Sequence, residues 1–373
     1  MGASKAVPRT LQFTPDAQQA QAIDHARGPL LVIAGAGTGK TTVLVKRIAR
    51  LIRDGCARPD EIMAVTYTEN AASQMETRIA AELGLGKVSG LQLKTFHSYC
   101  FDLLKRHGRG FDLLDESDMW IYLRRRIRDL ELKHYIRAAN LTEFLKSLLD
   151  FIRRCHDELV TPEQYAAYVR RVERGELEPP RVATSKTELS RDEALARCQE
   201  IAGVFTKVED MLRAENLGTF GHMIVRAHDL LVADPGVLEQ ERKRARFTLI
   251  DEFQDANFAQ VKIVKMLAGD ENNVFAVGDP DQSVYRFRGA SSAAFGLFRR
   301  NFPDTKLLVL DRNRRSLTPI LQSAFSVINR NPQVFGGNGE SAPDAYERRP
   351  LVSERDESAR AAGVPIAASP VTM

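Results

Sequence analysis

One glycine-rich turn constrains the fold of this chain more than any other feature of the sequence. It lies at residues 34–41 and has the sequence AGAGTGKT. An apolar run at residues 29–34 leads into it, and residues 40–53 follow with apolar side chains at helical spacing. A turn of small residues between a strand and a helix aims several backbone N–H groups at one point, where the helix N-terminus adds partial positive charge. The sequence therefore predicts a phosphate-binding P-loop, with alanine in place of the first glycine.

The residue types in this turn suit a bound nucleotide. Lys40 is expected to reach the β and γ phosphates, and the Thr41 hydroxyl is expected to ligate Mg²⁺. A glycine-rich turn that ends in lysine by chance is the alternative, and the strand before it and the helix after it disfavour that alternative. The residues expected to hold the nucleotide are Ala34, Gly35, Ala36, Gly37, Thr38, Gly39, Lys40, Thr41 and Thr42.

A second apolar strand, at residues 247–250, ends in the acidic sequence DEFQD at 251–255. Ligands of open α/β sheets bind beyond the carboxyl ends of the strands. Asp251 is suited to hold Mg²⁺ through water, and Glu252 to orient and deprotonate an attacking water. Adjacent acids after a strand more often cap a helix. Together with the lysine and threonine of the P-loop, however, they predict nucleotide hydrolysis rather than phosphotransfer, which an activated water would harm.

The order of patterns along the chain predicts an α/β fold with an interrupted sheet. Strand, helix and strand follow one another in residues 29–65, as in a parallel sheet. From about residue 101 to 216 the pattern changes to amphipathic segments such as 119–132 and 141–154, which predicts a helical insertion. Sheet-like runs return at 247–250, 274–277 and 306–310. The region from 331 to 373 is rich in Pro, Gly, Ser, Ala and charge, and we expect a loosely structured tail there, or a segment separated from a fold that should continue.

Composition excludes some function classes and identifies none. The chain has 53 Lys and Arg against 49 Asp and Glu, and a net charge of +4 is too small to indicate a nucleic-acid partner by itself. No apolar run approaches the ~18 residues of a membrane helix, and the N-terminus has no apolar core for export. We therefore expect a cytoplasmic protein that does not bind membranes.

Two motifs together resemble a known family. The sequence DEFQD at 251–255, followed by VGDPDQSVYRFRGA at 277–290, strongly resembles superfamily 1A DNA helicases of the UvrD/Rep/PcrA type. The resemblance runs from about residue 13 to 331. Gln19 matches the adenine-reading Q motif of that family. Its single-strand-contact and later nucleotide motifs are matched at residues 66–68, 95–97 and 313–316.

The resemblance implies a domain organisation. It implies a RecA-like P-loop NTPase parallel sheet with an inserted all-helical subdomain and the start of a second RecA-like domain. Residues 10–102 and 218–308 would form the first RecA-like domain, 103–217 the helical subdomain, and 309–373 an incomplete second domain with the loose tail. Residues 316–373 hold no candidate for the last two family motifs, one of which carries an arginine finger. We therefore expect the N-terminal half of such an enzyme, whether truncated, fragmentary or dependent on a partner.

The resemblance also implies roles for single residues. Gln282 would sense the γ-phosphate, and Arg315 would contact it from the second RecA-like domain. Tyr67 and Phe287 would stack on single-strand bases, and stacking tolerates any base sequence. The implied catalytic residues are Asp251, Glu252, Gln282 and Arg315; Thr41 and Asp251 would hold Mg²⁺; Gln19 joins the nucleotide site; Thr66, Tyr67, Thr95, His97 and Phe287 would bind DNA.

Four places in the sequence depart from the family pattern. Phe287 replaces the more usual tryptophan, which reduces the stacking area. Glu69 and Asn70 stand where Asn-Lys is common, which removes a positive charge near the expected DNA track. Residues 219–222 lack the acidic pair that the family often has there. Arg314 occupies a position that often carries an aromatic ring stacked on adenine, and a guanidinium plane can stack as well.

The function implied is ATP-dependent translocation on single-stranded DNA with 3′-to-5′ polarity, and duplex unwinding in repair or recombination. ATP and Mg²⁺ would be the cofactors. Single-stranded and 3′-tailed DNA would be the partners, with a second subunit supplying the missing motor half. Two alternatives stay open: a motor subunit of a RecB/AddA-like helicase–nuclease, and a nucleotide-regulated DNA-binding module without unwinding activity. The basic clusters at residues 124–128 and 153–154 could follow a duplex backbone, but a solvated helix face is the favoured interpretation.

Overall fold

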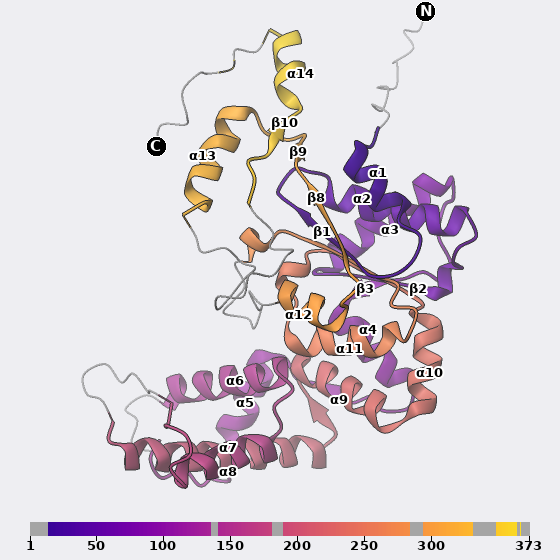
Figure 1. Cartoon of the computed structure of the whole chain (residues 1–373). Coiled ribbons are helices and arrows are strands. Elements are labelled where there is room, and N and C mark those ends of the chain that lie inside the picture. Colours follow the sequence, from indigo (N-terminus) through magenta and orange to yellow (C-terminus); the bar gives the residue numbers. More distant parts are fainter. Residues whose placement is uncertain are drawn as a thin grey trace, which may run out of the picture.

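A six-stranded parallel sheet forms the body of the molecule (Figure 1). The structure is a computed structural model, and it describes residues 14–135, 141–180, 189–283, 294–330, 348–363 and 366. The strand order is β3-β2-β6-β7-β1-β8, and every neighbouring pair is parallel. The strands are β1 (Leu30–Ala34), β2 (Ile62–Thr66), β3 (Gln92–Thr95), β6 (Phe247–Ile250), β7 (Val274–Gly278) and β8 (Lys306–Leu310). The predicted α/β class is confirmed.

Helices cover both faces of this sheet, which explains why its inner strands are continuous apolar runs. Successive residues of a strand point to opposite faces. Leu30 and Val32 therefore join one hydrophobic cluster, and Leu31 and Ile33 join the other. The first face is covered by α1 (Ala17–Asp24), α2 (Lys40–Arg53) and α3 (Glu69–Leu83). The second is covered by α4 (Phe96–Arg106), α9 (Phe220–Ala233), α10 (Pro235–Arg244), α11 (Phe258–Ala268) and α12 (Ala294–Asn301).

The expected helical insertion forms a separate layer beside α9 and α11 (Figure 1). It consists of α5 (Glu116–Arg125), α6 (Leu141–Asp157), α7 (Pro162–Glu173) and α8 (Arg191–Ala214). Helices α5, α6 and α8 share their own core, in which Leu145 and Phe205 are fully buried, and α7 packs on α8 through a smaller cluster around Val169. Two short strands, β4 (Asp112–Leu113) and β5 (Leu217–Gly218), pair where the chain enters and leaves this layer. The helix predicted at 119–132 ends at Arg125, and turns follow it.

The chain continues past the sheet into a small separate unit. Strand β9 (Arg312–Asn313) pairs with β10 (Val352–Ser353), and these strands are accompanied by α13 (Thr318–Ile328) and α14 (Arg355–Ala361). The prediction of a loose tail is therefore wrong for residues 348–363. Glu354 helps to hold this segment against the chain that follows β8, since it forms ion pairs with Arg312 and Arg314. The residues that the structure describes also contain the short 3₁₀ turns η1 (Pro59–Glu61), η2 (Phe253–Asp255) and η3 (Pro280–Gln282).

All three internal limits of the predicted domains fall inside single elements. The limit at 102/103 falls inside α4, which continues to Arg106, and the limit at 217/218 divides the two-residue strand β5. The limit at 308/309 falls inside β8, which pairs with β1 as far as Leu310. The division into domains stays a prediction. Among the described residues, every helix is too short or too polar to cross a lipid bilayer.

Candidate functional site

The predicted P-loop connects β1 to α2. Gly37 and Gly39 have φ angles of +80° and +88°, a region that glycine enters without steric cost. Gly39 is also the N-cap of α2, and no side chain caps this helix. The Thr38 hydroxyl closes the turn by donating to the Gly35 carbonyl at 2.8 Å. No side chain therefore occupies the first N–H groups of α2, and these groups are available to bind an anion.

Gln19 supports this loop from α1. Its side chain is fully buried, and its Nε2 donates to the Thr38 carbonyl at 2.8 Å. Its Oε1 accepts the backbone N–H of Asp16 in the capping box that begins α1. A Cβ at Gly39 would lie 3.0 Å from Gln19 Nε2, so this glycine also makes room for the glutamine. The structure thus places Gln19 against the P-loop, while its predicted contact with adenine stays a prediction.

Four residues predicted for phosphate binding, metal binding or catalysis meet at the carboxyl edge of the sheet. The Thr41 hydroxyl lies 3.4 Å from Asp251 Oδ2, and Lys40 Nζ lies 3.1 Å from Glu252 Oε2. The chain reverses sharply after β6, since Glu252 has a φ of +49°, which is costly for a residue with a side chain. Such strain is typical of functional sites, and here it accompanies a carboxylate that faces the P-loop lysine.

The electrostatics of this edge suit a divalent cation. Burial, and then the neighbouring Glu252 carboxylate, raise the pKa of Asp251 to about 6. The pKa of Asp255 is raised to about 6 as well, by burial and then by Glu252. A cation would reverse this effect, because positive charge favours ionised carboxylates. The Thr41 hydroxyl and the Asp251 carboxylate are the hard oxygen donors that Mg²⁺ prefers, so these residues fit the ion.

Gln254 is a residue that the sequence analysis missed. It is buried, its Nε2 donates to Glu252 Oε2 at 2.7 Å, and its Oε1 accepts the Asp279 N–H at 2.9 Å. Gln282 Nε2 in turn donates to Asp279 Oδ2 at 2.6 Å. A Cβ at Gly278 would lie 2.6 Å from Gln254 Oε1, so only glycine fits there. The predicted phosphate sensor Gln282 is thus connected to Glu252 through two intermediate residues, the Gln254 side chain and the backbone N–H and carboxylate of Asp279.

The segment after β8 packs directly on the P-loop. Asn313 is 1% exposed, and its Nδ2 donates to the Ala36 carbonyl at 2.6 Å. Its Oδ1 accepts the backbone N–H groups of Arg315 and Ser316. A Cβ at Gly37 would lie 2.8 Å from the Cβ of Arg315. Arg315, which was predicted to contact the γ-phosphate, therefore lies beside the P-loop. The sequence analysis assigned no role to Asn313.

Arg314 lies where the family often has an aromatic ring. Its Nε donates to Glu354 Oε2 at 2.7 Å, and its Nη2 lies 3.6 Å from Asp16 Oδ2. These groups line a cavity of about 770 Å³ between α1 and the β9–β10 pair. Arg314 therefore lines an open space beside the start of α1.

The predicted DNA-contact residues lie at the opposite end of the same sheet edge. Thr66 ends β2 and is buried, Tyr67 follows it and is 40% exposed, and Thr95 ends the neighbouring strand β3. His97 packs against the ring of Phe220, with 5.9 Å between ring centroids. Phe220 is 49% exposed, and it was missed because its place beside His97 depends on the packing of α9 on α4. Phe287 lies outside the described residues.

The hydroxyl of Thr95 is engaged within the protein. It caps α4 by accepting the Ser98 N–H, and it lies 3.0 Å from Glu69 Oε1. Ser98 Oγ also donates to this glutamate, at 2.6 Å. Burial lowers the pKa of the His97 ring, which is therefore neutral at neutral pH. Any strand along this edge would pass Glu69, whose carboxylate is held by hydroxyls of α4.

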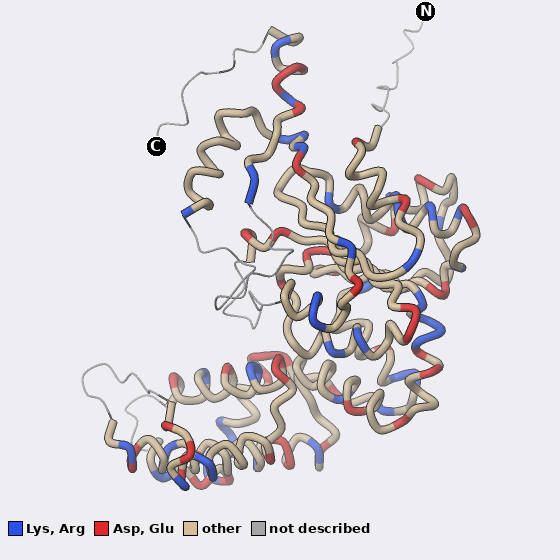
Figure 2. The backbone as a smooth tube through the Cα atoms, viewed as in Figure 1, with Lys and Arg blue, Asp and Glu red and all other residues tan. Residues whose placement is uncertain are grey.

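Several residues of the basic clusters of the insertion are paired with acids. Arg126, at the end of α5, contacts Glu215, at the end of α8, at 3.0 Å, and Arg153 and Arg154 both contact Asp150 within α6. Figure 2 shows basic and acidic residues interspersed along this layer. This favours the interpretation of a solvated helix face.

The fold and site together define the class. A parallel sheet with a P-loop after β1 and an acidic pair after β6 is a P-loop nucleotide-binding domain. Residues 16–303 match the model of the UvrD/REP helicase N-terminal domain, and the chain belongs to this family.

Similar proteins agree with this assignment. The ATP-dependent DNA helicase PcrA of Leuconostoc citreum is 31% identical over 91% of this chain and 43% of its own length. The ATP-dependent DNA helicase UvrD1 of Mycobacterium bovis is 35% identical over 84% of this chain and 39% of its own length. The ATP-dependent DNA helicase Rep of Escherichia coli is 34% identical over 85% of this chain and 43% of its own length. The chain thus spans about 40% of the length of these relatives.

Proposed function

We propose that this chain is the ATP-binding half of a DNA helicase motor that translocates 3′ to 5′ along single-stranded DNA and unwinds duplexes in repair or recombination. One observation carries the proposal: the Lys40–Glu252 and Thr41–Asp251 contacts combine a P-loop with an acidic pair. The names of the relatives, which are ATP-dependent DNA helicases, support the choice of substrate. A motor on chromosomal DNA would act in the cytoplasm.

The resting ion pair suggests how the site responds to ATP. The β and γ phosphates would attract Lys40 away from Glu252, since a phosphate carries more negative charge than a carboxylate. Glu252 would then be free to accept a proton from water, held in place by its hydrogen bond from Gln254. Mg²⁺ held by Thr41 and Asp251 would supply positive charge to the phosphate oxygens.

The connection from Glu252 through Gln254 and Asp279 to Gln282 supports a coupling of the two sites. A change at the phosphate would alter this chain of hydrogen bonds, and the residues after Gln282 are those expected to stack on DNA. Arg315, next to Gly37, would approach the phosphate from the other side. The DNA bases would contact Tyr67, and we add Phe220 to this surface because its exposed ring lies beside His97.

The first test is ATP binding by calorimetry with Mg²⁺. Lys40→Ala should weaken ATP binding by roughly 10- to 100-fold, because hydrogen bonds to charged groups contribute about 1.5–3 kcal/mol. Lys46→Ala is the matched control, since Lys46 lies on the same helix and pairs with Glu82. Circular dichroism should show both variants folded. Equal ATP affinity of Lys40→Ala and the parent would remove the phosphate role of the loop.

DNA-stimulated ATP turnover tests the alternatives. A DNA-binding module without unwinding activity would bind ATP and DNA with no turnover, even when the second motor half is added as a separate subunit. A helicase motor should gain turnover on single-stranded DNA from that addition. A helicase–nuclease subunit would further require a nuclease partner.

A further inference from the structure

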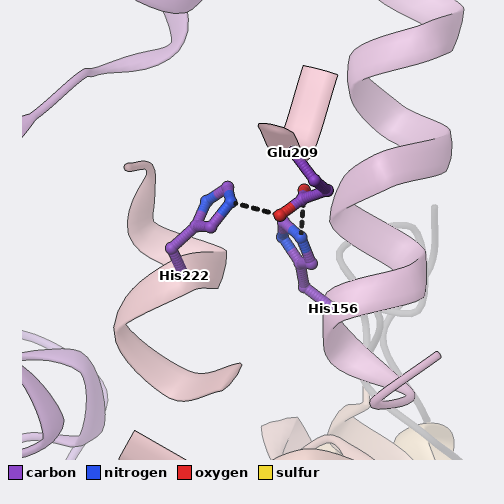
Figure 3. A group of neighbouring side chains, drawn as sticks. All are labelled: His156, Glu209 and His222. Atoms are coloured by element: carbon purple, nitrogen blue, oxygen red, sulfur yellow. Dashed lines mark hydrogen bonds and ion pairs between the residues drawn. The ribbon is translucent and has the colours of Figure 1, made fainter. Parts of the chain in front are cut away.

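Three ligand-type side chains from three helices converge where the helical insertion meets α9 (Figure 3). They are His156 on α6, Glu209 on α8 and His222 on α9. His156 Nε2 lies 3.1 Å from Glu209 Oε1, and His222 Nε2 lies 3.0 Å from Glu209 Oε2. The ligand atoms of all three groups lie within 4.8 Å of one another. No other such group is found in the part of the chain that the structure describes.

We propose that His156, Glu209 and His222 bind a Zn²⁺ ion that fastens the helical insertion to α9. Two imidazoles and one carboxylate are a donor set that Zn²⁺ accepts, with ligand distances of about 2.0–2.2 Å. Such distances place neighbouring ligand atoms about 3 Å apart, as the histidine nitrogens and glutamate oxygens are here. Mg²⁺ and Ca²⁺ prefer all-oxygen sites and are poor candidates.

Burial of the cluster favours a cation. The two histidines are 4% and 2% exposed. The Glu209 carboxylate contacts both rings, one through each of its oxygens. A cation among the three groups would offset the negative charge of this largely enclosed carboxylate.

The surroundings of His222 allow a metal at its Nε2. In the present hydrogen-bond pattern Nδ1 accepts the Thr219 backbone N–H at 3.1 Å, so the ring proton is on Nε2. Thr219 Oγ1 lies 2.9 Å from the same Nδ1. When a metal takes Nε2, the proton can move to Nδ1 and donate to this hydroxyl, the second contact typical of metal-bound histidine. The Thr219 N–H would then lose its acceptor, and the free-energy cost of that loss is small compared with the free energy of zinc binding.

The surroundings of His156 depend on a glycine. Its Nδ1 is buried without a hydrogen-bond partner. A Cβ at Gly221 would lie only 2.5 Å from this atom, so a residue with a side chain there would push the ring away from Glu209. His156 and Glu209 belong to the insertion, whereas His222 and Gly221 belong to the helix that packs on α4. A bound ion would therefore set the position of the insertion relative to the sheet.

The test uses the untagged 373-residue chain in buffer without chelator. After incubation with Zn²⁺ and dialysis, elemental analysis should find one zinc per chain. Co²⁺ should produce the visible absorption bands of a cobalt ion that has a low coordination number and is bound by nitrogen and oxygen ligands. Zn²⁺ should raise the midpoint of thermal unfolding and EDTA should lower it, because an ion that binds only the folded state stabilises it.

Variants separate this site from other histidines. Glu209→Gln and His222→Gln keep size and hydrogen-bonding capacity, and each should weaken Zn²⁺ binding by more than about tenfold. His228→Gln, on the same helix and beside Asp229, should bind Zn²⁺ as the parent does. Absence of stoichiometric zinc and of the cobalt spectrum in the parent chain would overturn the proposal and leave a hydrogen-bonded clamp. So would unchanged binding in folded His222→Gln, which would place the metal elsewhere.

Discussion

Asn313→Ala should release the segment after β8 from the P-loop. Asn313 is 1% exposed and takes part in three hydrogen bonds: its Nδ2 donates to the Ala36 carbonyl, and its Oδ1 accepts the N–H groups of Arg315 and Ser316. Alanine supplies none of them. A further bond, from the Arg314 N–H to the Gly37 carbonyl, would then be the remaining backbone link across this junction that the structure records.

The size of the effect follows from the count of groups left without partners. A buried polar group without a hydrogen bond costs about 1–3 kcal/mol. Three groups lose their partner here, and water reaches some of them because Arg315 is exposed. We therefore expect a local loss of roughly 2–4 kcal/mol, which corresponds to about 30- to 1000-fold faster exchange of the affected amides.

Native-state hydrogen exchange measures this directly. The Arg315 and Ser316 amides should exchange faster in Asn313→Ala, while amides of the β6 core keep their protection. Asn313→Asp keeps the acceptor, so these two amides should stay protected although the contact with Ala36 is lost. Arg312→Ala is the surface control, because the side chain of Arg312 is 53% exposed. Unchanged exchange of both amides in Asn313→Ala would refute the idea that this side chain holds the segment on the loop.

Two further predictions concern charge and stacking. Asp251 has its pKa raised to about 6 by burial and by Glu252, so its contribution to stability is present below about pH 4 and lost as the pH rises through about 6. Asp251→Asn should therefore stabilise the nucleotide-free chain at neutral pH by up to about 3 kcal/mol and flatten that part of the pH profile in urea titrations; an unaltered profile would contradict the assignment. Tyr67→Ala and Phe220→Ala should each weaken binding of single strands of any base composition by about 1–3 kcal/mol in fluorescence anisotropy, with Val232→Ala as the exposed control, and a changed base preference at equal affinity would argue against stacking.

The nucleotide site could be predicted from sequence because its parts are local. A P-loop is one continuous turn, and DEFQD directly follows a strand, so the rule that ligands bind at the carboxyl ends of parallel strands brings Lys40 and Glu252 together. The strand order confirms this expectation, since only β7 separates β6 from β1. Gln254 lies within the same motif, but its partner Asp279 follows a different strand. Its function could not be inferred without the register of β6 and β7.

Features that depend on distant packing escaped prediction. Asn313 acquires a role only because the chain after β8 returns to the P-loop. Residues 348–363 look loose in composition, yet β10 finds a partner in β9 across a long separation in sequence. The cluster of His156, Glu209 and His222 draws on three helices, and no spacing rule for metal ligands connects them. In each case the contact forms between segments whose approach the local pattern does not encode.

Glu252→Gln should strengthen ATP binding even as it abolishes hydrolysis in an assembly that includes the second motor half. In the nucleotide-free structure Lys40 Nζ is 3.1 Å from Glu252 Oε2, so phosphate has to compete with this carboxylate for the lysine. Glutamine keeps the size of the side chain and removes the charge. The side chain of Glu252 is 35% exposed, so solvent screening limits the ion pair to about 0.5–1 kcal/mol, or roughly a two- to fivefold gain in ATP affinity. Calorimetry on the isolated chain measures this gain, and weaker ATP binding by Glu252→Gln would mean that the carboxylate helps to hold the nucleotide, directly or through Mg²⁺, rather than competing with it.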